Sequence, residues 1–171
     1  MPEFLLDYMD FFSLGGPVLL LIACVSVILW ILILERYWFF SRSFPEKLVR
    51  MSGQWQQRKD HISWYALRLR EGLLSELSMS LREHLMTIRA LIAVLPLLGL
   101  LGTVTGMISI FDVLNVFGTG NPRGMAAGIS RALLPTTAGL AASLLGLFFS
   151  SDINGRAVKL EDKARDLLTP H

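Results

Sequence analysis

The sequence predicts an all-α integral membrane protein with three membrane-spanning helices. Its 171 residues are 53% hydrophobic and only 18% charged, and the charged residues are confined to separate stretches. Between those stretches lie three runs without any charged residue, 14–34, 90–111 and 132–151. Each run matches the roughly 20 apolar residues that a helix needs to cross a bilayer core. This pattern excludes an ordinary water-soluble enzyme.

The N-terminal part is expected to form a periplasmic amphipathic segment, 1–13, followed by a first span, 14–38. The leader is acidic and has no Lys or Arg, whereas a secretory signal peptide begins with basic residues. The span closes with Arg36 and two aromatic residues, which are typical interfacial anchors. Its middle is bulky, without a stripe of small residues, so we expect it to face lipid. Cys24, the single cysteine, is expected to be a small buried residue of this helix.

The segment 39–89 is expected to be a cytoplasmic helical region, with a cytoplasmic tail at 152–171. Its apolar residues recur every three or four positions, which is the helical period: Ile62, Ala66, Leu69, Leu73, Leu77, Leu81, Leu85 and Ile88. This pattern predicts an amphipathic helix that continues into the second span, with a possible break at Gly72. Candidate partners for its apolar face are the first helix, the tail and neighbouring subunits. The tail presents Ala157, Leu160, Ala164 and Leu167 on one face, and Glu161 can pair with Arg165.

The second span, 90–116, and the third, 124–151, are joined by an outer loop at 117–123 and carry small residues at helical spacing. We expect these residues to pack helices closely, since lipid gives apolar helices no hydrophobic reason to associate: Gly99, Gly102, Gly106, Gly128, Gly139 and Ser143. Packing within one chain would satisfy this pattern. The alternative is a tightly packed oligomer around a narrow polar path, which the small residues by themselves favour less.

Hydroxyl groups within these two spans allow two interpretations. Pro96 and Pro135 each leave a carbonyl four residues earlier without its usual donor, and a nearby hydroxyl can repair that loss. A hydroxyl is also what a water or proton path needs, because it both donates and accepts. The central part of each span lacks Asp, Glu and His, so a proton path would take its ionisable group from a partner.

The distribution of basic residues predicts the topology. Of the 16 Lys and Arg residues, all but Arg123 and Arg131 lie between Glu35 and Arg89 or after Asp152. Such residues mark the cytoplasmic side, which places the N-terminus outside and the C-terminus in the cytoplasm. Acidic residues interleave with the basic ones, so we expect no nucleic-acid partner.

Asp112 and Arg131 are the charged residues nearest to membrane depth at the outer side. We expect an ion pair between them, and the alternative is that Arg131 meets a carboxylate on another protein. His61 and His84 have no companions at metal-ligand spacing, and the chain has no phosphate loop or nucleophile motif. The sequence therefore predicts no enzyme activity, no metal and no cofactor.

Two blocks of the sequence resemble a known family, with the topology and the long loop as further support. Residues 96–111, PLLGLLGTVTGMISIF, and residues 128–140, GISRALLPTTAGL, are similar to the ExbB/TolQ/MotA proton-channel family. The short chain and the RALLPTT block are most similar to the ExbB of second-type TonB systems. Most ExbB and TolQ proteins have a glutamate where this chain has Arg131, and a small residue where it has Pro135.

The resemblance implies a homo-oligomeric ring, expected to be a pentamer, in the bacterial inner membrane. Spans two and three would line a pore that holds a dimer of ExbD, and Thr103 and Thr136 match the family's pore-facing threonines. Proton flow would energise TonB for outer-membrane uptake of ferric siderophores and similar cargo. The alternatives are a TolQ-like envelope-maintenance role and a passive membrane scaffold.

Overall fold

The computed structural model describes residues 3–57, 63–117 and 122–168, and all the regular elements among them are helical. The order is α1 (Glu3–Trp38), the π-helix η1 (Phe39–Ser43), α2 (Phe44–Gln56), α3 (Trp64–Arg82), α4 (Leu85–Phe117) and α5 (Pro122–Leu167). Three helical stretches of the described chain are long and apolar enough to cross a membrane, in α1, α4 and α5. The all-α class with three spans is therefore confirmed.

The chain divides into two compact units, each built from segments far apart in the sequence. The first, here called the span unit, comprises residues 1–30 and 90–147. The second, here called the charged unit, comprises residues 31–89 and 148–171. The charge-free parts of α4 and α5 fall almost entirely in the span unit, whereas η1, α2 and α3 belong to the charged unit.

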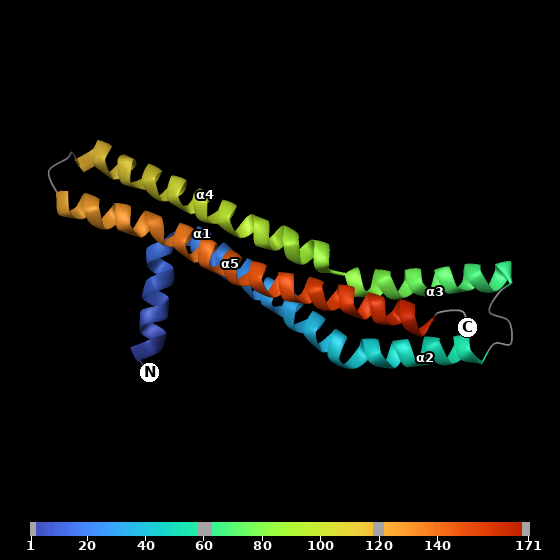
Figure 1. The fold of residues 1–171 in the computed structure, drawn as a ribbon. Helices are drawn as coiled ribbons and strands as arrows, with labels where there is room; N and C mark the ends of the chain where they lie inside the picture. The colour runs from blue at the N-terminus through green and yellow to red at the C-terminus, as the bar shows by residue number, and fades with distance from the viewer. Residues whose placement is uncertain (1–2, 58–62, 118–121, 169–171) are drawn as a thin grey trace. The chain divides into compact units, whose positions relative to one another are not determined.

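Helix α1 is interrupted at Gly16, where its direction changes (Figure 1). Gly16 has φ 66° and ψ −171°, a conformation that only glycine adopts at little cost because it has no Cβ. Pro17 follows and begins the next helical stretch with its fixed φ. The break separates the segment before Gly16 from the first span. The amphipathic character expected for residues 1–13 concerns side chains that lie outside the described part of the structure.

The first span packs in the span unit through one face only. Val18, Leu19, Ile22 and Leu29 are buried, while many of the large apolar residues between them are exposed. The span is thus half engaged by its own chain, and its other face is available to lipid or to further chains. Cys24 is exposed, so the expectation that it is buried was wrong, because it lies on the outward face of the helix.

The core of the charged unit is formed by apolar stripes on α2, α3 and the end of α5. The buried side chains include Phe44, Leu48, Met51, Trp55, Ala66, Leu77, Leu81, Ile153, Ala157, Ala164 and Leu168. Hydrogen bonds from Arg70 to the Leu168 carbonyl and from Arg82 to Glu161 join α3 to α5. The tail, one of the three candidate partners, therefore does contact α3. Leu167 is exposed and Leu168 buried, which corrects the predicted face at the end of α5.

Helices α3 and α4 are separate, with the break at residues 83–84 (Figure 1). The prediction of one continuous helix with a possible break at Gly72 was wrong. Gly72 lies inside α3, and no side chain or distant backbone approaches within 4 Å of the position its Cβ would take. The actual break falls at His84, the one non-glycine residue with a positive φ in the described part of the chain, at 61°.

Candidate functional site

Helices α4 and α5 of the span unit touch through their backbones at three glycines. A Cβ built on Gly106 would lie 2.9 Å from the Ala132 Cα, and one on Gly139 would lie 2.6 Å from the Leu95 carbonyl oxygen. At Gly99 it would lie 2.9 Å from the Thr136 Cα. These separations leave no room for a larger residue. Such backbone contact is the arrangement that small residues permit between membrane helices.

The other predicted packing residues meet side chains instead of backbone. A Cβ on Gly102 would overlap the Pro135 ring and would lie 3.3 Å from Val18 of α1. A Cβ on Gly128 would lie 3.0 Å from Ile110. The notch at Gly102 therefore receives both a ring from α5 and a methyl group from α1.

Gly146 plays the same part further along α5. Its Cβ position lies 2.9 Å from both Ile92 of α4 and Leu29 of α1. Sequence reasoning did not assign α1 this role, because it looked for small residues on α1 itself. The glycines are on α4 and α5, and α1 supplies the bulky side chains that fill them.

Two hydroxyls form hydrogen bonds across the α4–α5 interface. Thr136 Oγ1 donates to the Gly99 carbonyl at 2.7 Å, and Ser143 Oγ donates to the Ile92 carbonyl at 3.0 Å. Ile92 precedes Pro96 by four residues, so its carbonyl is the one that the proline leaves without an intrahelical donor. The repair that the sequence suggested therefore takes place, and its donor comes from the opposite helix.

Thr103 and Thr137 bond instead to carbonyls of their own helix. Thr103 Oγ1 donates to Leu100 at 2.7 Å, and Thr137 Oγ1 donates to Leu134 at 2.9 Å. Thr103 is half-buried and Thr137 is exposed. The structure thus places the two predicted path residues differently, with Thr136 bonded between the helices and Thr103 bonded within α4. In each case the hydroxyl hydrogen is used and the oxygen can still accept.

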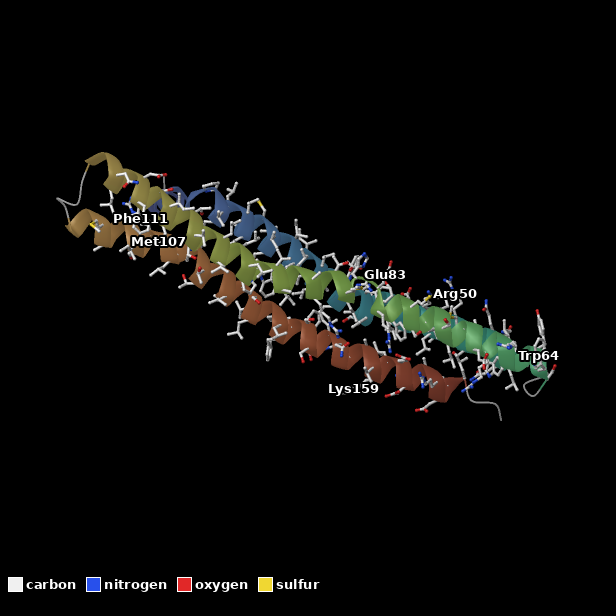
Figure 2. All side chains as sticks on the ribbon, turned by 90° about the horizontal axis from the view of Figure 1, so that it is seen from above. Arg50, Trp64, Glu83, Met107, Phe111 and Lys159 are labelled. Atoms are coloured by element: carbon white, nitrogen blue, oxygen red, sulfur yellow. The ribbon has the colours of Figure 1, made fainter. Side chains whose placement is uncertain are left out.

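Asp112 and Arg131 are both exposed, and the ion pairs formed among the described residues include neither of them. Asp112 directly follows Phe111, which Figure 2 labels toward the C-terminal end of α4. Their pairing stays a prediction, as does the alternative that Arg131 meets a carboxylate of another chain.

The charged unit contains a feature that sequence reasoning missed, the buried side chain of Arg36. It is 1% exposed and forms hydrogen bonds with Glu35, with the Ser80 carbonyl and with His84. The available signal was a charge pair at the very end of an apolar run, which we interpreted only as an interfacial anchor. His61 and His171 lie outside the described part of the chain. Among the residues that the structure describes, no three potential metal ligands lie together.

These features define a class: a helical membrane protein whose second and third spans are joined through glycines and hydroxyls and contain no acid between 90 and 111 or between 132 and 151. The chain belongs to the MotA/TolQ/ExbB proton channel family, whose profile matches residues 41–166. The resemblance inferred from the two sequence blocks is thereby confirmed.

Three relatives carry ExbB in their names. A biopolymer transport protein ExbB homolog of Methanothermobacter thermautotrophicus is 29% identical over 86% of this chain and 63% of its own length. An ExbB-like protein of Synechocystis sp. is 44% identical over 35% of this chain and 25% of its own length. A second ExbB-like protein of the same organism is 34% identical over 51% of this chain and 42% of its own length. The chain thus spans less than two thirds of the length of each of these relatives.

Proposed function

We propose that this chain is the inner-membrane proton-channel subunit of an ExbB–ExbD–TonB type complex. In this role it couples the proton motive force to TonB-dependent outer-membrane uptake of ferric siderophores and similar cargo. The observation that carries the proposal is the chemistry of the second and third spans. They hold hydroxyls and close-packed glycines but no acid of their own between 90 and 111 or between 132 and 151, in a chain of a proton channel family.

A single copy leaves most of each span uncovered. Only 28%, 22% and 22% of the most apolar stretches of the three spans are buried within the chain. The free faces can therefore contact lipid and further copies. We propose a homopentameric ring in which spans two and three surround a central path. A dimer of ExbD places a membrane helix with a carboxyl group in that path, because proton transfer at neutral pH needs a group that titrates.

Thr103 and Thr136 are the proposed hydroxyls of the path. Each already donates its hydrogen to a backbone carbonyl, so its oxygen lone pairs are the part available to water or to a partner's protonated carboxyl. Such a hydroxyl accepts a hydrogen bond without carrying charge itself. It therefore stabilises the neutral acid during passage through the bilayer without adding a fixed charge to the path.

The proposed topology places the N-terminus in the periplasm and the C-terminus in the cytoplasm. The charged unit then lies on the cytoplasmic side, as the positive-inside rule requires. Arg131 sits near the outer end of span three, where an exposed cation is suited to meet a carboxylate of the partner or Asp112.

Proton flux in liposomes tests the proposal directly. The chain would be reconstituted alone and with the ExbD-type protein of the same genome, and an internal pH dye would follow protons driven by a potassium diffusion potential. We expect flux only with the partner, and loss of flux when the partner's membrane aspartate is changed to Asn. Intact complexes without flux would instead indicate a passive scaffold, and co-purification with Tol partners only would indicate the TolQ-like role.

The hydroxyl role predicts the effect of Thr103→Val. This variant should assemble normally but conduct about tenfold more slowly, equivalent to one lost hydrogen bond of about 1.4 kcal/mol. Thr87→Val is the matched control, because Thr87 is exposed near the start of α4, outside the predicted span. Thr103→Val is the cleaner choice, since Thr136→Val also breaks the bond to Gly99. Full flux in Thr103→Val complexes would show that the hydroxyl takes no part.

A further inference from the structure

Arg36 near the end of α1 is a buried cation that bonds to its neighbour Glu35 and also reaches both sides of the break between α3 and α4. Its Nε and Nη2 donate to the two carboxylate oxygens of Glu35 at 2.9 and 3.1 Å. Nη1 donates to the Ser80 carbonyl in the last turn of α3 at 3.2 Å. The Arg36 guanidinium also stacks over the Phe39 ring at 4.9 Å. A guanidinium fixed on several sides is a rigid donor.

The second hydrogen of Nη2 is directed at His84, with 2.8 Å between Nη2 and the imidazole Nδ1. Arginine offers only donors, so Nδ1 must accept, and the imidazole is then neutral with its proton on Nε2. The His84 side chain is 43% exposed, and water can therefore reach it. One protonation state of the histidine is thus tied to one hydrogen-bond arrangement.

His84 also holds the unusual backbone of the junction. Its φ of 61° is a left-handed conformation that crowds the Cβ of any residue other than glycine and is therefore unfavourable for histidine. The break separates Arg82, the last residue of α3, from Leu85, the first of α4, and Glu83 is labelled there in Figure 2. The hydrogen bond from Arg36 is a specific contact that offsets this strain.

The charged groups that face His84 make its protonation consequential. Glu35 Oε2 lies 3.8 Å from Nδ1, and Glu83 lies 3.7 Å from Arg36. Several charged groups of the other elements pair away from His84: Glu76 with Lys47, Asp152 with Arg156 and Tyr37, and Glu161 with Arg82 and Arg165. The effect of protonating His84 therefore depends on its neighbours Arg36, Glu35 and Glu83.

We infer that His84 is a proton-responsive latch, which fixes the α3–α4 junction while neutral and releases it when protonated. A proton on Nδ1 turns the acceptor into a donor opposite Nη2 of Arg36, so the hydrogen bond breaks and two cations face each other. The imidazolium then pairs with Glu35 or Glu83. Histidine is the side chain that ordinarily changes charge between pH 5 and 8. The latch responds to pH on its own side of the membrane, whether or not the spans conduct protons.

Spin-label distances across the junction test this inference in the full chain. Cys24→Ser removes the single native thiol, and nitroxides are attached to Leu67→Cys on α3 and Thr87→Cys on α4, both exposed positions. Distance distributions are recorded at pH 7.5 and pH 5.5. We expect the wild-type junction to shift or to gain a second, displaced population at pH 5.5.

Two variants at position 84 give opposite expectations. His84→Asn tolerates a positive φ and keeps an acceptor for Arg36 but cannot titrate, so it should show the pH 7.5 distribution at both pH values. His84→Gly keeps the backbone conformation without strain but has no acceptor, so it should show the released distribution at both. The latch is overturned if the wild-type distribution is the same at the two pH values, or if His84→Asn shifts as far as the wild type. Because these readouts need no partner and no proton flux, they stand apart from the proposed channel role.

Discussion

The span unit and the charged unit hold their helices together by opposite means. In the span unit, α4 and α5 touch where side chains are missing, as at Gly106 and Gly139. In the charged unit, bulky apolar side chains form a core and ion pairs surround it, with Arg36 buried among them. The difference follows from the solvent. Water drives apolar stripes together in the charged unit, whereas lipid does not, so the spans depend on close contact and hydrogen bonds.

The largest effect is expected from adding one methyl group in the span unit. Gly139→Ala places a Cβ 2.6 Å from the Leu95 carbonyl oxygen, so one helix must move, and we expect destabilisation at the upper end of about 1–3 kcal/mol. Gly72→Ala is the matched change in the charged unit, where the Cβ meets open space. It should stabilise α3 by about 0.5–1 kcal/mol. Thermal unfolding in detergent measures both, and equal effects would remove the contrast between the units.

The next effect concerns the buried arginine. Arg36→Met removes donors that serve Glu35 and Ser80, and we expect a loss of about 2 kcal/mol, typical for hydrogen bonds to charged groups. Arg165→Met removes a comparable arginine–glutamate pair in which the arginine is 61% exposed, and such pairs contribute less than about 1 kcal/mol. Unfolding by denaturant compares the two variants. A loss in Arg165→Met as large as that in Arg36→Met would contradict the importance of burial.

A smaller effect is expected from the hydroxyl that crosses between the spans. Ser143→Ala leaves the Ile92 carbonyl without its donor, and hydrogen bonds between membrane helices contribute about 0.6–1.7 kcal/mol. Ser109→Ala is the control, since Ser109 bonds only to Thr105 of its own helix and is exposed. It should change stability by less than about 0.5 kcal/mol. The same unfolding assay separates them, and the bond would be dispensable if the two variants behaved alike.

The smallest effect is a pH dependence of the charged unit. Burial by itself raises the pKa of Glu161, but hydrogen bonds from Arg82 and Arg165 outweigh it and hold that pKa below the ordinary glutamate value. A depressed pKa stabilises the fold above the pKa of the unfolded state, and this stabilisation is lost as the pH falls through the folded-state pKa. Acidification should therefore weaken the contact between α3 and α5, and Glu161→Gln should reduce that part of the acid sensitivity. A pH profile identical to that of the wild type would refute this assignment.

The spans could be predicted because their signal is local: charge-free runs of the right length identify them without any tertiary information. The α3–α4 junction could not. Helix propensity favours a break at Gly72, but Gly72 lies within α3, and the break falls where Arg36 reaches His84 from a distant part of the chain.

The candidate site could also be predicted only in part. Glycine spacing on α4 and α5 indicated close packing, but not which neighbour fills each notch, such as Leu29 at Gly146. The roles of Thr103 and Thr136 depend on the rotation of each helix about its axis, which no periodicity specifies to within one residue. A hydroxyl that bonds within its helix and one that bonds across the interface look the same in the sequence.

The paired bonds from Thr136 to Gly99 and from Ser143 to Ile92 have a mechanical consequence. They lie seven residues apart on both helices, about two turns, so the same two helices are joined at two successive positions. Rotation of span two against span three would break both hydrogen bonds, and little water is present at that depth to form new ones with the freed groups. Whatever displacement this protein undergoes in the bilayer should carry these two helices as a single rigid pair.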